Sequence, residues 1–215
     1  MDLHELGLFL FRWMHVLFGI VWIGMLYYFN FVQGEYFKEA TADAKADALK
    51  KLAPRALWWF RWGAMFTFVT GLVLFYHLAR HDLTNLYIVF GASMATLMFL
   101  NVWLIIWPNQ KIVCGIVPGN AAEAGPKALL ASRTNVLFSA PMLFGMLASG
   151  HLGGKGSSLL AANASSTALT LSLLIIASLE ANAIWGKIGP MQTVKGVIHM
   201  SLALTVVMVA IVNYL

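Results

Sequence analysis

The 215-residue chain is 60% hydrophobic and only 11% charged, with a net charge of +5 and a mean hydropathy of +0.76. This composition is typical of a polytopic membrane protein, so the positive charge is expected to orient the chain in a membrane and not to bind nucleic acid. The single cysteine, Cys114, excludes an internal disulfide, a thiolate zinc cluster and a CxxCH site for covalent haem. We expect a single all-α domain over residues 1–215, a polytopic transmembrane bundle of about six helices.

Six apolar stretches of spanning length follow one another along the chain. They are expected at residues 8–33, 57–77, 86–107, 129–150, 167–187 and 191–215. No basic leader or small-residue cleavage signal accompanies the first stretch, so we expect it to be retained. No internal repeat is visible, which weakens the case for a transporter built from inverted halves.

The connections and breaks follow from composition and from proline. Residues 35–56 are rich in Ala, Lys and Glu, which predicts an amphipathic surface helix that ends near Pro54. Pro108 is expected to end the third span in the same way, and Pro141 to kink the fourth. The Gly-, Ala- and Pro-rich residues 114–127 are expected to be irregular.

Basic residues are unevenly divided between the two sides. The loops after the first, third and fifth stretches hold most of them, whereas the opposite loops offer only Arg80 and Lys155. By the positive-inside rule the basic loops face the cytoplasm, which places both termini in the periplasm of a bacterial inner membrane. The basic residues in and beside the cytoplasmic loops are Lys38, Lys45, Lys50, Lys51, Arg55, Lys111, Lys127, Arg133, Lys187 and Lys195.

A histidine lies at membrane depth in the first stretch. His15, Gly19 and Trp22 are spaced i, i+4 and i+7, which puts an imidazole, a gap and an indole on one helical face. Ionisable groups inside a membrane usually serve a function. A flat, bulky cofactor could lie against this face. The alternative is an imidazole that only forms a hydrogen bond with a neighbouring helix.

Further histidines suggest a partner for His15. His199, with Gly196 one turn before it, is expected within about a turn of the bilayer centre, as His15 is. Neutral imidazole is a common axial ligand of iron, so His15 and His199 could hold one haem b between them. The same small residues could instead only pack two helices together. His77 and His151, at outer helix ends, could hold a second haem or simply extend into water.

Two charged residues complete the candidate site. Glu180, inside the fifth stretch, could pass protons or form a hydrogen bond with a neighbouring helix. Arg133, near the inner end of the fourth stretch, could bind a small anionic substrate or meet lipid phosphate. Copper or zinc on the same histidines is less favoured, because Glu180 is the only carboxylate inside a span.

Four segments together resemble the membrane-embedded N-terminal domain of the bacterial, cytochrome-c-linked urate oxidases. They cover residues 13–33, 54–64, 101–111 and 131–144, and the third of them, NVWLIIWPNQK, is the most distinctive. The last third of the chain is matched only generically, by a helix that carries His199. The first helix also resembles that of membrane protoporphyrinogen oxidases and of copper-resistance membrane proteins.

This resemblance implies a membrane oxidoreductase or electron-transfer subunit. It would pass electrons from a small substrate, such as urate or another purine, towards a c-type cytochrome, which the family carries after its last helix. Since this chain ends at Leu215 without a CxxCH motif, the expected acceptor is a separate cytochrome. The alternatives are a transporter or channel for a small anion or purine, and an assembly subunit. Association with a second copy is left open.

Overall fold

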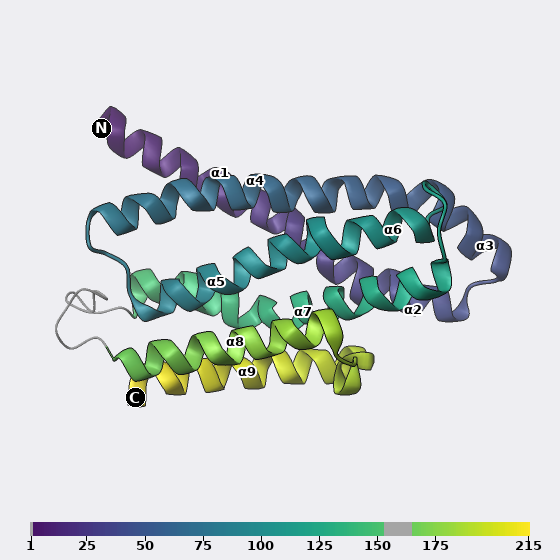
Figure 1. Cartoon of the computed structure of the whole chain (residues 1–215). Coiled ribbons are helices and arrows are strands. Elements are labelled where there is room, and N and C mark those ends of the chain that lie inside the picture. Colours follow the sequence, from purple (N-terminus) through teal and green to yellow (C-terminus); the bar gives the residue numbers. More distant parts are fainter. Residues whose placement is uncertain (1, 153–164) are drawn as a thin grey trace.

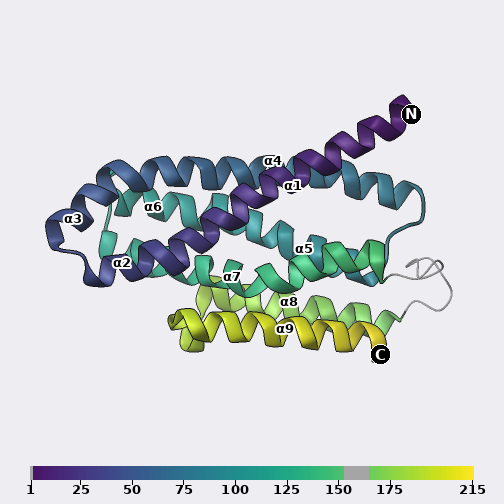
Figure 2. The same cartoon turned by 180° about the vertical axis from the view of Figure 1, so that it is seen from behind.

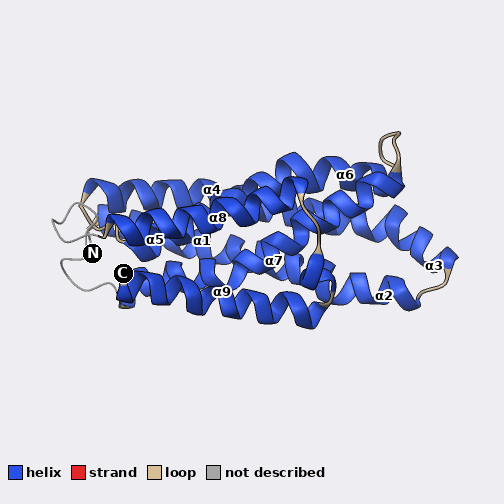
Figure 3. Ribbon diagram, turned by 60° about the horizontal axis from the view of Figure 1, so that its bottom comes forward, coloured by secondary structure: helices blue, strands red, loops and turns tan. Residues whose placement is uncertain are grey.

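The computed structural model describes residues 2–152 and 165–215, and it is an elongated bundle of long helices (Figure 1). Those residues contain no strand, so the predicted all-α bundle is confirmed (Figure 3). The α-helices are α1 (Leu3–Tyr27), α2 (Gly34–Glu39), α3 (Ala42–Asp47), α4 (Ala53–Arg80), α5 (Leu86–Leu100), α6 (Trp107–Val113), α7 (Ala121–His151), α8 (Ser166–Trp185) and α9 (Val194–Tyr214). Three π-helical segments, η1 (Tyr28–Gln33), η2 (Ala48–Leu52) and η3 (Asn101–Ile106), and the 3₁₀ turn η4 (Gly189–Gln192) join them.

Five helical stretches are long and apolar enough to cross a membrane. They are Leu3–Glu39, Ala42–Arg80, Leu86–Val113, Ser166–Trp185 and Val194–Tyr214. The sixth long helix, α7, runs through the middle of the bundle between the α1 and α4 pair and the α8 and α9 pair (Figures 1 and 2). Its polar side chains are buried there, which explains why its sequence is less apolar than that of the surrounding helices.

The polypeptide ends and the connections divide between the two ends of the bundle. Both termini lie at one end, together with the connection between α4 and α5 (Figure 3). The α2–α3, α6–α7 and α8–α9 connections lie at the other end (Figure 1). This is the arrangement that an even number of long helices, joined end to end, requires. The predicted loop that carries Lys155 falls outside the described residues.

Two prolines that were expected to end helices do not. Pro54 lies in the first turn of α4 directly after η2, and Pro108 in the first turn of α6 directly after η3. A proline in a regular α-helix lacks the N–H for the i−4 carbonyl and clashes with it. Here the preceding backbone already bonds from i to i−5, as Ala53 N–H does to Ala48 O and Trp107 N–H to Val102 O. The wider turn therefore lets each helix continue.

Two other helix boundaries differ from the prediction. The amphipathic segment expected at residues 35–56 is divided: its first part extends the first span through α2, and its second part, from Ala42, continues into α4. Residues 121–127, which were expected to be irregular, form the first turns of α7, and the side chain of Asn120 caps the Ala122 N–H at 3.0 Å. The small residues of the predicted loop are compatible with a helix once a cap starts it.

Close helix approaches fix the bundle around α7. A Cβ at Gly145 would lie 2.6 Å from Tyr87 O of α5, so the two backbones can meet only because no side chain stands there. Pro141 leaves the Leu137 carbonyl without its helical donor, and Ser201 of α9 donates to it instead at 2.8 Å. These contacts place the buried face of α7 against α5 and α9.

Candidate functional site

The middle of α7 carries a row of buried polar side chains. Arg133, Asn135 and Ser139 are all enclosed by the bundle, and Arg133 is only 4% exposed. Polar groups in such a place are costly unless they are partnered, so their partners define what the site can do.

Two nitrogens of the Arg133 guanidinium have no hydrogen-bond partner among the described residues. These two atoms, Nε and Nη1, are buried and donate no hydrogen bond within the described part of the chain. The carboxylate whose charge acts on it is Glu35 of α2, yet Glu35 pairs with Lys38 at 2.8 Å, and no described acidic group lies within 4.0 Å of Arg133. A guanidinium stays charged in a protein, so this arrangement leaves a buried cation with unused donors.

Unused acceptors lie on η1, the segment that packs on this part of α7. Asn30 donates to Ser132 Oγ at 2.7 Å, and Ser132 directly precedes Arg133. The other amide atom of Asn30, Oδ1, is buried and has no partner in residues 2–152 and 165–215, and the same holds for Oε1 of Gln33. The segment η1, which bonds to the residue directly before Arg133, therefore carries acceptors without a donor among the described residues.

A second polar group is fully connected. Asn101 of η3 donates to Asn135 Oδ1 at 3.0 Å and to Glu180 Oε2 of α8 at 3.1 Å. Asn135 in turn donates to the Met98 carbonyl at 2.9 Å. Glu180 thus reaches the interior from α8 and is tied to α7 through a single carboxamide. Proton transfer and a structural hydrogen bond are both compatible with this position.

Both polar groups are built from π-helical segments. Asn30 and Gln33 belong to η1, and Asn101 belongs to η3. A π turn interrupts the regular bonding of a long helix and is often found at functional sites. In this bundle Asn30 of η1 and Asn101 of η3 each donate to a side chain of α7.

His15 packs against α4. Its Nδ1 lies 2.9 Å from Thr67 O and 3.1 Å from Thr70 Oγ1, and its ring rests on Gly71, where a Cβ would be 3.0 Å from Cε1. A carbonyl oxygen can only accept, so Nδ1 carries the proton and Nε2 keeps its lone pair. Metal-ligating histidines are usually oriented by such a bond.

The rest of the predicted cofactor face on α1 is also covered by α4. A Cβ built at Gly19 would have the Thr67 methyl group as its nearest neighbour, at 4.0 Å. Trp22 is buried against Gly63 of α4, where a Cβ would lie 3.1 Å from the backbone nitrogen of Trp22. The gap predicted beside His15 therefore faces a helix.

His199 is not brought to His15. It is exposed on α9, next to Ile198, which lines a cavity together with Tyr27 of α1. Tyr27 follows His15 by 12 residues in the sequence, which is about 18 Å along a helix. A haem held between His15 and His199 does not fit this arrangement. The presence of glycine at position 196 is explained by packing, because a Cβ there would lie 2.1 Å from Pro190 O.

The outer histidines are paired differently from the prediction. The His77 ring lies 4.5 Å from that of His81 and 5.9 Å from that of His4, centroid to centroid. His151 bonds to Leu147 O of its own helix at 2.9 Å. In residues 2–152 and 165–215, no group of three His, Cys, Asp or Glu side chains is arranged to hold a metal ion.

Sequence reasoning found Arg133 and Glu180 but missed the carboxamides that surround them. Asn30, Gln33 and Asn101 were read as parts of apolar runs and helix ends. The available signal was their position: a buried carboxamide inside a spanning stretch needs a partner on another helix.

A model of one protein family, described as urate oxidase N-terminal, matches residues 80–213. The match includes Arg133, Glu180 and His199, and it extends through the last third of the chain, which the quoted segments left generic. The segments at 13–33 and 54–64 lie before it. Neither a curated protein nor a solved structure matches this chain. Since the family match covers more than half of the 215 residues, the chain belongs to the urate oxidase N-terminal family.

Proposed function

We propose that this chain is a membrane oxidoreductase or electron-transfer subunit that binds a small organic anion, urate or another purine, at Arg133. The observation that carries the proposal is the buried guanidinium whose Nε and Nη1 have no partner among the described residues. Leaving a buried charge unpaired costs several kcal/mol, on the order of what a bound anion would recover. A planar anion suits a guanidinium because two parallel hydrogen bonds can form.

The surrounding acceptors fit the same class of ligand. A purine anion presents ring N–H donors beside its oxygen acceptors. Asn30 Oδ1 and Gln33 Oε1 are buried acceptors to which no described residue donates, and they lie on the segment that contacts Ser132. A ligand with both kinds of group would satisfy Arg133 and the two carboxamides together, which a simple inorganic anion would not.

Glu180 is proposed as the proton acceptor. Removing electrons from a substrate that carries N–H groups releases protons, which need a base inside the bundle. Glu180 is linked through Asn101 to Asn135, two residues after Arg133. Its place in this connected group supports a path from the anion site to α8.

Haem b and a separate c-type cytochrome stay part of the proposal as cofactor and acceptor. His15 has the Nδ1–H to carbonyl bond that orients a ligating imidazole, but the pair His15 and His199 does not fit one haem, so no step is assigned to that group. A bacterial inner-membrane location with periplasmic termini is supported by the basic residues in the loops at the opposite end from the termini.

Calorimetric titration of urate into the purified chain in nanodiscs tests the anion site. We expect binding by the unmodified chain and a loss of affinity of about 30-fold or more in Arg133→Gln. Arg61→Gln is the control, because the Arg61 guanidinium already stacks on Trp107 at 3.9 Å. Equal affinity in the unmodified chain and in Arg133→Gln would remove Arg133 from the site.

The redox part is tested separately. Reduced-minus-oxidised absorption spectra report bound haem, and urate-dependent reduction of an added c-type cytochrome reports electron transfer. A chain that binds urate, carries no chromophore and moves urate into proteoliposomes would be a transporter, and the oxidoreductase proposal would be wrong.

A further inference from the structure

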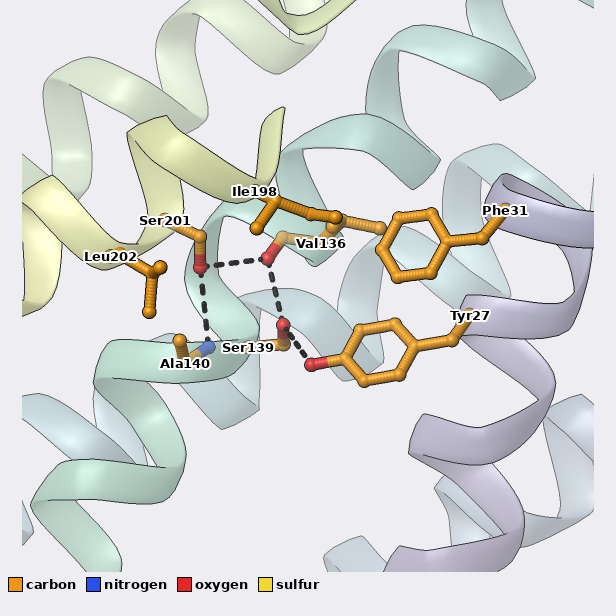
Figure 4. Close-up of a pocket in the computed structure, with 8 residues that line it drawn as sticks. All are labelled: Tyr27, Phe31, Val136, Ser139, Ala140, Ile198, Ser201 and Leu202. Carbon is orange, nitrogen blue, oxygen red and sulfur yellow. Dashed lines mark hydrogen bonds between the residues drawn. The ribbon is translucent and has the colours of Figure 1, made fainter. Parts of the chain in front are cut away.

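A cavity of about 220 Å³ lies between α1, α7 and α9 (Figure 4). Its wall is almost entirely apolar. The lining residues are Tyr27, Phe31, Val136, Ser139, Ala140, Ile198, Ser201 and Leu202. A dry cavity of about 150 Å³ in another protein holds benzene, so the volume here is sufficient for a substituted six-membered ring.

The cavity is reached from the side of the bundle. Leu202 of α9 is 55% exposed and Ile198 is 37% exposed, and both line it. The α1 and α9 helices belong to stretches that are long and apolar enough to cross a membrane. A ligand that enters between them therefore comes from the bilayer and not from water.

Most polar atoms at the wall are already engaged. Ser201 Oγ donates to Leu137 O at 2.8 Å and accepts from Ala140 N–H at 3.4 Å. Ser139 Oγ donates its one proton to Val136 O at 2.7 Å. Neither serine has a proton left for a ligand.

The Tyr27 hydroxyl is oriented by one of these serines. Its hydroxyl lies 2.8 Å from Ser139 Oγ, and because the serine proton is used elsewhere, the tyrosine must be the donor of this bond (Figure 4). The phenolic oxygen is then an acceptor with an unused lone pair on the cavity wall. An apolar ring that carries an O–H group could donate a hydrogen bond to this oxygen, whereas a ring with only carbonyl groups could not.

We propose that this cavity binds the ring of a membrane-soluble hydroxylated ligand of the isoprenoid quinol class, with its hydroxyl donating to Tyr27. The inference rests on the volume, the lateral access and the unused lone pair of the Tyr27 hydroxyl. It does not depend on the anion site at Arg133, and either can fail without the other.

Binding of a short-tailed quinol and of its quinone form to the chain in nanodiscs tests the proposal, under anaerobic conditions so that neither form converts. Quenching of the protein fluorescence gives both affinities. We expect the quinol to bind about five- to tenfold more tightly, which corresponds to one neutral hydrogen bond. In Tyr27→Phe the preference should disappear while the quinone affinity stays unchanged.

Two further variants separate the cavity from general effects. Leu202→Trp fills the mouth and should weaken both ligands, with the unfolding temperature showing that the bundle is intact. Tyr214→Phe, at a tyrosine that is 86% exposed outside the cavity, should change neither. Equal quinol and quinone affinities, a preference that survives Tyr27→Phe, or displacement of both by a spin-labelled acyl chain would show a non-specific lipid groove and overturn the proposal.

Discussion

Replacing Arg133 by methionine should stabilise the ligand-free protein while it removes anion binding. Methionine has a similar length and no charge. In the free protein, two buried guanidinium nitrogens lack partners among the described residues, and each orphaned buried donor costs about 1–3 kcal/mol. Removing both should therefore raise the free energy of unfolding by about 2 kcal/mol or more. An arginine kept only for packing or structure would give the opposite sign.

The assay is reversible denaturant unfolding in detergent micelles, in buffer free of organic anions and phosphate. Adding urate at 100 times its dissociation constant should stabilise the unmodified chain by about 2.7 kcal/mol and leave Arg133→Met unchanged. Arg61→Met is the matched control and should be destabilised, because it loses the stacking of Arg61 on Trp107. If Arg133→Met is destabilised in anion-free buffer, the guanidinium has a structural partner and the reasoning is refuted.

Three other predictions concern single contacts. Ser201→Ala should lower the free energy of unfolding by about 1–3 kcal/mol, because the carbonyl that Pro141 leaves free loses its donor. A combined Pro141→Ala change should recover part of this loss, and no recovery would contradict the assignment. A double-mutant cycle between Asn101 and Asn135 should give a coupling of about 0.6 kcal/mol, with 1.7 as the upper range, and zero coupling would disprove the bond. Burial raises the pKa of the Cys114 thiol, so alkylation should increase only at higher pH than for a free cysteine, and an identical pH–rate profile would count against burial.

The helical architecture could be predicted because hydropathy and length act locally. A run of about 20 apolar residues specifies a spanning helix whatever its neighbours are. The ends at Pro54 and Pro108 were wrong for the same reason: the rule for proline assumes α-helical bonding, and the π turns before both residues change that bonding. Nothing in the local composition distinguishes a π turn from an α turn.

The candidate site was predictable only in part. Arg133 and Glu180 stand out because charges are rare in spans. The sequence places His15 on a face but cannot say which helix covers that face, and in the structure it is α4. A pairing such as that of His15 with His199 depends on helix order around the bundle, which charge and periodicity leave undetermined.

A π turn also determines the direction in which the side chains after it point around the helix axis. One residue corresponds to a rotation of about 100° around a helix axis, so the additional residue in η3 rotates everything after it relative to α5. Deleting one residue from Asn101–Ile106 would restore an ordinary α-helix and would turn Trp107 and its stacked Arg61 partner away from each other. The insertion thus lets both halves of one continuous span stay against α7 while Trp107, in the second half, reaches Arg61 of α4.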